Sequence, residues 1–103
     1  MNPEPIPNLD RTIHEQGRLG IMSLLAASAE LSFTELRDHL GMTDGNVTTH
    51  IRTLQEAGYV SVTKSYEHKR PLTTCALTSK GRAAFTAYIN SLEKIVQQNK
   101  SRK

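Results

Sequence analysis

The stretch of sequence that decides the fold is LSFTELRDHLGMTDGNVTTHIRTLQEAGYV, which occupies residues 31–60. Within it, Ser32 and Glu35 have the spacing of a capping box. The serine hydroxyl can accept a hydrogen bond from the Glu35 amide, and the glutamate carboxylate can accept one from the Ser32 amide. This pattern predicts a short helix that begins after Ser32. Gly41 stands where the chain must leave this helix with positive φ, so the helix is expected to end there.

A second helix is predicted over residues 43–57, after a tight turn that contains Gly41. At about 100° per residue, Val47, Ile51 and Leu54 fall within a narrow arc, which predicts that they form the buried side. The opposite face has small polar side chains and is largely uncharged. Its residues are Gly45, Asn46, Thr48, Thr49, Arg52, Thr53 and Glu56.

The hydrophobic period changes to two after the second helix. Residues 59–66 and 72–78 are rich in β-branched and aromatic side chains, which favours two strands. The segment EHKRP between them carries charge and a proline, which is typical of a turn. The sequence therefore predicts an antiparallel hairpin whose basic tip is formed by His68, Lys69 and Arg70.

Longer helices are predicted on both sides of this unit. Asn8 is the expected cap of a long first helix. Gly17 and Gly20 lie inside it. Each glycine lowers the stability of a helix by about 1 kcal/mol relative to alanine, so the pair predicts a kink, a break or a close backbone contact. Thr78 is the expected cap of a last helix, whose apolar stripe keeps the i, i+3, i+4, i+7 spacing. The stripe consists of Phe85, Tyr88, Ile89, Leu92, Ile95 and Val96.

The chain is expected to form one domain with loose ends. Its 103 residues and 11.5 kDa suffice for a single domain with a modest core. Alternating prolines predict a flexible arm over residues 1–7, and the domain is expected over residues 8–98. The terminal segment QQNKSRK should fray, which leaves residues 99–103 as a basic tail.

The formal net charge of +3 hides an uneven distribution. Residues 59–82 hold five basic and one acidic side chain, and residues 94–103 hold four basic and none, so each segment has a charge of +4. Residues 1–58 hold four basic and eight acidic side chains, a charge of −4, and Glu93 supplies the remaining −1. The hairpin region is therefore the expected contact for a polyanion.

Several classes of site are not favoured. Cys75 is the single cysteine, so no disulfide or Cys-x-x-Cys zinc site can form within the chain, and the four histidines offer no His-x-x-x-His pair on one helix. We therefore expect no metal and no cofactor, and we expect Cys75 to be a buried or half-buried strand residue. No Gly-x-Ser-x-Gly elbow or phosphate-binding glycine loop is present, so no catalytic residue and no enzyme activity are predicted.

The expected location is the cytoplasm, with association with the nucleoid if the cell is prokaryotic. The first residues lack the basic and apolar regions of a signal peptide. No stretch approaches the roughly 18 apolar residues that a membrane span requires, so no membrane partner is expected.

Two helices joined by a tight turn make a helix-turn-helix, and a basic hairpin after them makes it winged. A major groove about 12 Å wide admits one helix, and small polar side chains let it lie deep enough for Asn46, Thr49 and Arg52 to reach base edges. The basic hairpin tip, with Lys64 behind it, suits contacts with phosphates. His50 lies near the edge of the buried stripe, which favours a packed or phosphate-touching role over a base contact.

The motifs TDGNVTTHIRTLQEAGYV (43–60) and LTSKGRAAF (77–85) resemble small winged-helix transcriptional regulators related to the MarR and ArsR families. The resemblance covers roughly residues 13–96; it departs at HEQGRLGIM, where relatives often have proline in place of Gly17. It implies a DNA-binding regulator that usually acts as a homodimer, with residues 43–53 as the recognition helix. The predicted DNA-binding residues are Thr43, Gly45, Asn46, Thr48, Thr49, Arg52, Thr53, Lys64, His68, Lys69 and Arg70.

The apolar stripe of the last helix predicts that this helix dimerises, together with the first. If its large side chains stayed in water, each would lose the roughly 1.5–3 kcal/mol of stabilising free energy that its burial provides. A two-fold dimer whose recognition helices lie about 34 Å apart matches the half-sites of an inverted-repeat operator. The predicted interface residues are Leu9, Ile13, Phe85, Tyr88, Ile89, Leu92, Ile95 and Val96.

Two functions are compatible with these patterns. The first is a sequence-specific transcriptional regulator, expected to be a repressor, that binds double-stranded DNA. The second is a winged-helix module that contacts another protein through the hairpin or the polar helix face, without specific DNA binding. Titration with DNA at two salt concentrations distinguishes them, because the affinity of a basic DNA-binding protein falls steeply with salt. No motif identifies a small-molecule effector.

Overall fold

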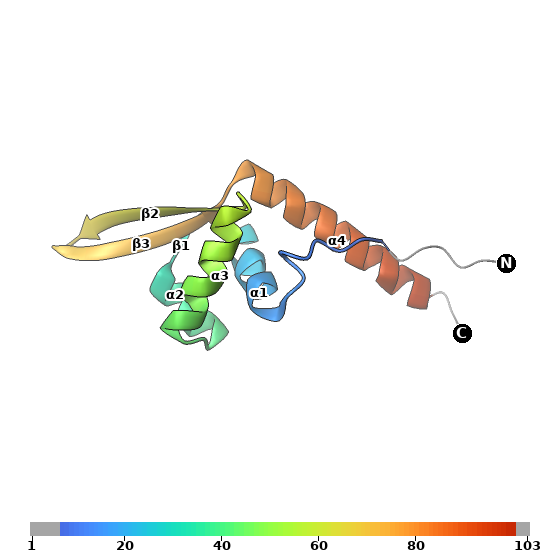
Figure 1. Cartoon of the computed structure of the whole chain (residues 1–103), viewed down its shortest axis with the longest axis horizontal. Helices are drawn as coiled ribbons and strands as arrows, with labels where there is room; N and C mark the ends of the chain where they lie inside the picture. The colour runs from blue at the N-terminus through green and yellow to red at the C-terminus, as the bar shows by residue number, and fades with distance from the viewer. Residues whose placement is uncertain (1–6, 101–103) are drawn as a thin grey trace.

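The computed structural model describes residues 7–100, which form four helices and a three-stranded antiparallel sheet (Figure 1). The strand order in the sheet is β1 (Leu31–Ser32), β3 (Arg70–Leu77), β2 (Val60–Glu67). This confirms the predicted fold class, which is mainly α with a small antiparallel hairpin in a winged helix-turn-helix. The elements in chain order are α1 (Gln16–Ala26), β1 (Leu31–Ser32), α2 (Phe33–Leu40), α3 (Asp44–Glu56), β2 (Val60–Glu67), β3 (Arg70–Leu77) and α4 (Ser79–Lys100).

The helix-turn-helix follows the predicted local signals. The Ser32 hydroxyl accepts from the Glu35 amide at 3.0 Å, and the Glu35 carboxylate accepts from the Ser32 amide at 2.8 Å, which starts α2. Gly41 ends α2 with a φ of 62°. Thr43 then caps α3 by accepting from the amide of Asn46 at 3.1 Å. The turn is thus fixed at both sides by short-range hydrogen bonds.

Strand β1 is an element that the sequence patterns did not predict. Leu31 pairs with Cys75, and Ser32 pairs with Thr74. A strand of two residues is too short for its side chains to alternate recognisably. It ties the start of α2 to the central strand β3, so the base of the hairpin is joined to the helix-turn-helix.

The first helix is shorter than predicted. α1 begins at Gln16, where Glu15 is its cap, and not after Asn8. The preceding chain turns instead, because the main-chain oxygen of Asp10 accepts from the amide of His14 at 2.7 Å. The apolar residues before Gln16 had suggested a continuous helix, but a turn that packs against the rest of the chain can bury them equally well.

The two glycines of α1 provide close contacts between helices, one of the predicted outcomes. A Cβ on Gly17 would lie 2.7 Å from the His50 ring, and one on Gly20 would lie 2.8 Å from the Leu40 side chain. The missing side chains therefore let α2 and α3 approach α1 closely.

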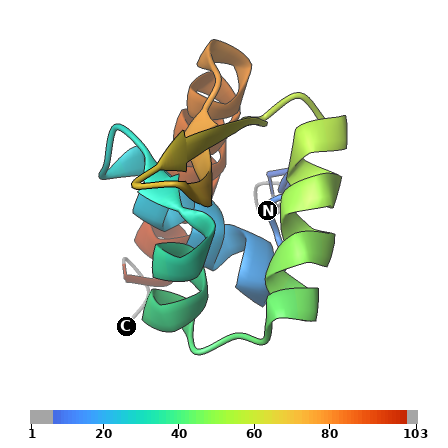
Figure 2. The ribbon, with the colours of Figure 1, turned by 90° about the vertical axis from the view of Figure 1, so that its left-hand side faces the viewer.

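The core lies where α1, α2 and α3 meet the base of the sheet (Figure 2). Val47, Ile51 and Leu54 are buried, which confirms the predicted inner stripe of α3. The Tyr59 hydroxyl donates to the Asp10 carboxylate, and this bond, together with burial, raises the pKa of Tyr59 to about 12. The buried apolar side chains are Ile13, Ile21, Met22, Leu25, Leu36, Val47, Ile51, Leu54, Val60, Cys75 and Tyr88.

The hairpin of β2 and β3, called the wing below, has a tighter turn than the sequence suggested. Glu67 pairs with Arg70, so the loop consists of His68 and Lys69 alone. Their φ angles are 51° and 65°, which is the left-handed geometry of a two-residue hairpin turn. The basic tip is therefore displayed at the end of two regular strands.

Pro71 lies inside β3 opposite Tyr66, although its presence had suggested an interruption of the strand. In an antiparallel pair, hydrogen-bonded and non-hydrogen-bonded residue pairs alternate, and a two-residue loop closes on a hydrogen-bonded pair. The next pair along therefore needs no ladder bond from its amides. Proline is tolerated there because the N–H group that it lacks would not bond to β2.

Replacing His68 by Asn is expected to stabilise the wing, because the left-handed region is strained for most L-residues and asparagine adopts it more readily. We expect amide hydrogen exchange in the wing strands to slow by about fivefold, which corresponds to a rise of about 1 kcal/mol in the free energy of local opening. Ser65→Asn, which places the same residue in a strand, should accelerate exchange. Equal exchange rates in the His68→Asn variant and the wild type would contradict the prediction.

Helix α4 begins at the predicted cap but runs further than predicted. The Thr78 hydroxyl accepts from the Gly81 amide at 2.9 Å. Residues 97–100 were expected to fray, yet they are helical, because no glycine or proline follows Gly81 and the Asn99 side chain donates to the Ile95 carbonyl at 2.9 Å. The remainder of the predicted tail and residues 1–6 of the predicted arm lie outside the described residues.

Candidate nucleic-acid interface

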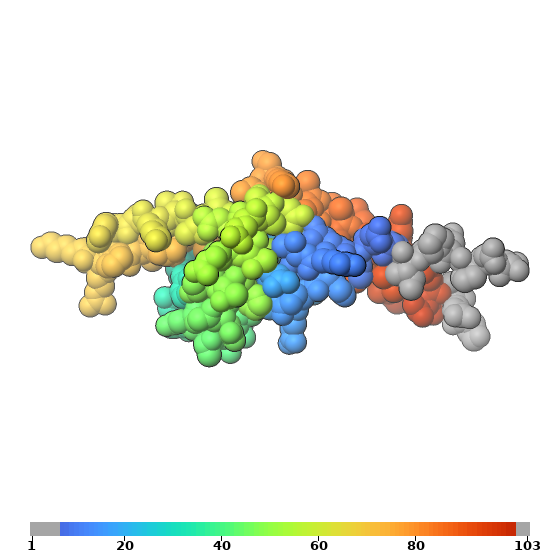
Figure 3. Space-filling model, viewed as in Figure 1, coloured from blue at the N-terminus to red at the C-terminus, as the bar shows by residue number. Residues whose placement is uncertain are grey.

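Helix α3 presents its polar face to solvent (Figure 3). Thr53 is half-buried, and its hydroxyl donates to the main-chain oxygen of Thr49 at 3.1 Å. Asp44, at the start of the helix, is paired with Arg37 at 3.0 Å, so its charge is compensated. The face therefore offers hydroxyl, amide and guanidinium groups, with the exposed carboxylate of Glu56 at its C-terminal end. The predicted residues that are exposed on or beside it are Thr43, Gly45, Asn46, Thr48, Thr49 and Arg52.

His50 joins α3 to the start of α1. Its ring packs against Gly17, and its Nδ1 lies 3.6 Å from a carboxylate oxygen of Glu15 and 3.4 Å from a guanidinium nitrogen of Arg18. The pKa of Glu15 is lowered from its ordinary value, mainly because its carboxylate accepts from the Arg18 amide. Of the two roles predicted for His50, packed or phosphate-touching, the structure shows the packed one, in which the ring contacts the start of α1.

The wing projects away from the helices (Figures 1 and 3). Lys64, His68, Lys69 and Arg70 are all exposed. Glu67, the single acidic side chain of residues 59–82, lies 3.9 Å from the His68 ring. The tip therefore keeps an excess of positive charge on a segment whose backbone is held by regular strand pairing.

A cleft of about 400 Å³ separates α3 from the sheet. Gln55 and Thr73 line it, although neither was among the predicted site residues. Thr73 is the cross-strand partner of Lys64, and Gln55 follows Arg52 at helical i+3 spacing. These spacings were available from sequence, but the orientation of the wing toward α3 was not. The lining is apolar at Phe33 of α2, Ile51 of α3 and Val62 of β2, and polar at Thr48, Arg52 and Gln55 of α3, Lys64 of β2 and Thr73 of β3.

The predicted dimer residues divide into three groups by their burial in the single chain. Ile13 and Tyr88 are buried within the single chain, and the Tyr88 hydroxyl lies 2.7 Å from the Nδ1 of His14. Their assignment to the interface is therefore corrected: an apolar stripe on a helix does not distinguish residues that face their own core from residues that face a partner. Ile89 and Val96 are 40% and 45% exposed. Leu9, Phe85, Leu92 and Ile95 are half-buried.

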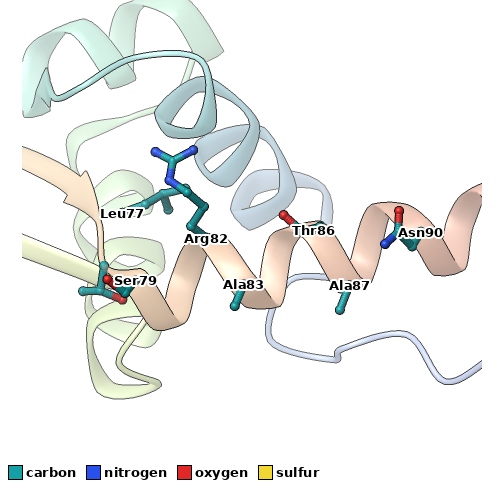
Figure 4. Close-up of a pocket in the computed structure, with 8 residues that line it drawn as sticks. Leu77, Ser79, Arg82, Ala83, Thr86, Ala87 and Asn90 are labelled. Carbon is teal, nitrogen blue, oxygen red and sulfur yellow. The ribbon is translucent and has the colours of Figure 1, made fainter.

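A shallow groove of about 630 Å³ lies along the first turns of α4 (Figure 4). Ala83 and Ala87 point away from the sheet and α1, whereas Arg82 and Thr86 project on the other side of the helix. The Arg82 guanidinium donates to the main-chain oxygen of Ala26 at 3.4 Å. Arg82 therefore contacts the rest of the chain, while the two alanines leave a smooth exposed surface.

Residues 7–100 contain no group of three His, Cys, Asp or Glu side chains that could hold a metal ion. Cys75 is buried, as predicted, and burial raises the pKa of its thiol to about 11. None of the helices in the described part of the chain has the length and apolar character that a membrane span needs.

Comparisons with known proteins agree with this geometry. Residues 18–96 match a family described as winged helix DNA-binding domain. A Methanocaldococcus jannaschii protein described as uncharacterized is 39% identical over 72 residues, which cover 70% of this chain and 78% of that protein.

Solved structures of regulators have the same arrangement. A transcriptional regulator homologue from Pyrococcus horikoshii OT3 is 29% identical, with a TM-score of 0.80 over 84% of this chain and 86% of that chain. A protein described as a transcriptional regulator of the MarR family, from Enterococcus faecalis V583, is 25% identical, with a TM-score of 0.72 over 89% of this chain and 84% of that chain.

Proposed function

This chain belongs to the winged helix DNA-binding domain family, as a transcriptional regulator of MarR type, and from this premise we propose that it binds an inverted-repeat operator as a homodimer. We propose further that it reads bases with α3, contacts phosphates with the wing, and represses transcription. A dimer bound across a promoter obstructs polymerase without any further contact, which favours repression over activation. The proposed site of action is DNA in the cytoplasm, at the nucleoid of a prokaryotic cell.

The observation that carries this proposal is the pairing of an exposed polar helix face with a basic wing. Asn46 and Thr49 stand on the exposed side of α3. Asparagine can bond bidentately to adenine in the major groove, and threonine can bond to any base or contact a thymine methyl group. Lys69 and Arg70 stand at the tip of the wing, where they can contact phosphates or the adjacent minor groove.

The homodimer part of the proposal rests on α4. Its 22 residues extend for about 33 Å, and its second half projects beyond the three-helix core (Figure 1). Ile89 and Val96 are exposed there at a spacing of two helical turns. A second copy that packs on this stripe would remove both side chains from water and present two recognition helices to one face of the DNA.

Replacing Lys69 and Arg70 together by Ala is expected to weaken binding to operator and random DNA by the same factor. Each lost phosphate contact removes about one unit from the slope of log affinity against log salt, so the slope should fall by about 2. Fluorescence anisotropy titrations over a series of salt concentrations measure both quantities. The operator is obtained by selection from a random pool with the wild-type protein.

Asn46→Ala serves as the matched comparison, because it removes a neutral group that is proposed to read bases. This variant should have a lower affinity for the operator, whereas its affinity for random DNA and the slope of log affinity against log salt should be unchanged. If the wild-type protein shows no salt-dependent affinity for DNA, the proposed function fails, and binding to another protein becomes the favoured function of this fold.

A further inference from the structure

We propose that the cleft between α3 and the wing binds the sugar-phosphate backbone of one DNA strand. In this site Arg52 and Lys64 contact a single phosphate from opposite sides, and Tyr66 packs on the adjoining deoxyribose. The inference rests on the proposed function and deepens it. It assigns Arg52 to the backbone rather than to base reading, and it adds Tyr66 to the DNA-binding surface.

The position of Arg52 around α3 separates it from the base-reading residues. At about 100° per residue, Arg52 and Asn46 point about 120° apart, with Thr49 between them. Arg52 lines the cleft together with Thr48 and Gln55, so its side of the helix faces the wing. Asn46 lies toward the other edge of the exposed face. The helix therefore divides into a wing-facing side and a side that is free to enter a groove.

The wing offers a matching surface toward the same cleft. Residues at alternate positions of a strand share a face, so Val62, Lys64 and Tyr66 of β2 lie on one side of the sheet. Val62 and Lys64 line the cleft with Thr73, which shows that this side looks toward α3. Tyr66 continues the row toward the wing tip, where its side chain is 80% exposed.

The charges in the cleft favour an anion. Arg52 comes from α3 and Lys64 from β2, and the cleft lining includes no acidic side chain. Among residues 7–100, no carboxylate forms an ion pair with either of these cations. Two unpaired cations on facing elements repel each other. A phosphate between them would attract both cations and so offset this repulsion. The Thr48 and Thr73 hydroxyls supply further donors.

Tyr66 favours a nucleic-acid backbone over a free anion. Tyr66 is 80% exposed, so most of its surface is in water even with Pro71 as its cross-strand neighbour. A deoxyribose presents apolar C–H groups directly next to a phosphate, so a backbone strand in the cleft would place a sugar against the ring. A free phosphate would leave the ring in water.

The proposal is tested with Arg52→Ala, Lys64→Ala and Tyr66→Ala, and Lys94→Ala serves as a control because Lys94 is an exposed lysine of α4. Affinity is measured for the selected operator and for a random duplex of equal length, over a series of salt concentrations. We expect Arg52→Ala and Lys64→Ala each to weaken both complexes equally, on the order of tenfold, and to lower the salt slope by about 1. Tyr66→Ala should weaken both complexes with the slope unchanged, and Lys94→Ala should change neither.

A second measurement locates the phosphate. Operators that carry one neutral methylphosphonate at successive positions are titrated with the wild-type protein and with the Arg52→Ala, Lys64→Ala double variant. One position in each half-site should weaken binding of the wild type and have no further effect on the double variant, because the contact is already lost.

Three outcomes would overturn the proposal. If Arg52→Ala lowers only operator affinity and keeps the salt slope, Arg52 reads a base. If Tyr66→Ala behaves as Lys94→Ala does, Tyr66 makes no contact with DNA. If the methylphosphonate effects in the wild type and the double variant are equal at every position, no phosphate lies between the two cations. All three outcomes require a wild-type protein that binds DNA, so they are distinguishable from failure of the proposed function itself.

Discussion

Replacing Gly81 by Ala is expected to lower the free energy of unfolding by about 3 kcal/mol or more, a large part of the stability of a small domain. A Cβ at this position would overlap the main-chain oxygen of Tyr59. The same oxygen accepts from the Thr78 amide at 3.0 Å, and the Thr78 hydroxyl donates to the Gly58 oxygen at 2.6 Å. The obstruction is thus backbone held by hydrogen bonds, and α4 would have to leave the base of the sheet.

Chemical denaturation followed by circular dichroism measures this effect, and Gly45→Ala is the matched control. Nothing lies within 4 Å of a Cβ on Gly45, which sits in the exposed first turns of α3. Alanine there should raise the free energy of unfolding by up to about 1 kcal/mol, because it favours the helix without a clash. A Gly81→Ala variant as stable as the wild type would show that α4 can shift away from Tyr59 at little cost.

The elements that were predicted correctly depend on neighbouring residues in the chain. The capping box at Ser32, the left-handed Gly41 and the cap at Thr78 each involve hydrogen bonds over a few residues, so their sequence signals are sufficient. The pairing of β1 depends on distant partners, and so does part of what holds the turn before α1. Asp10 holds Tyr59 across 49 positions of the chain, and no local pattern reports such a contact.

The candidate site was predictable residue by residue but not as an arrangement. Helical spacing predicted that Thr49 and Arg52 are exposed, and composition predicted a basic wing tip. Which side of α3 faces the wing depends on how the hairpin leaves the core, and this decides that Arg52 and Lys64 line one cleft. For the same reason, Tyr66 was not singled out: as one aromatic residue in a strand, it gave no sign of which elements it faces.

Replacing Ile89 and Val96 together by Glu is expected to dissociate the dimer and to lower operator affinity on the order of 10²–10⁴-fold, because the two half-sites then bind independently. Both side chains are exposed in the single chain, so the substitutions should leave the fold intact. Two glutamates on each copy would place like charges in an interface that is otherwise apolar. Sedimentation reports the assembly, and titration with intact and half operators reports the loss of linked binding.

Ala87→Glu separates this interface from the smooth face of α4. Ala87 lines the groove along the first turns of α4, and at about 100° per residue it points about 160° away from Ile89. It should leave both the dimer and the operator affinity unchanged. Dissociation by Ala87→Glu alone would move the interface to the alanine face, whereas a monomeric wild-type protein would remove the geometric reason for an inverted-repeat operator. The Ala87→Glu variant and the Ile89→Glu, Val96→Glu double variant should both bind a half operator with wild-type affinity, because α3 and the wing of each copy are unchanged.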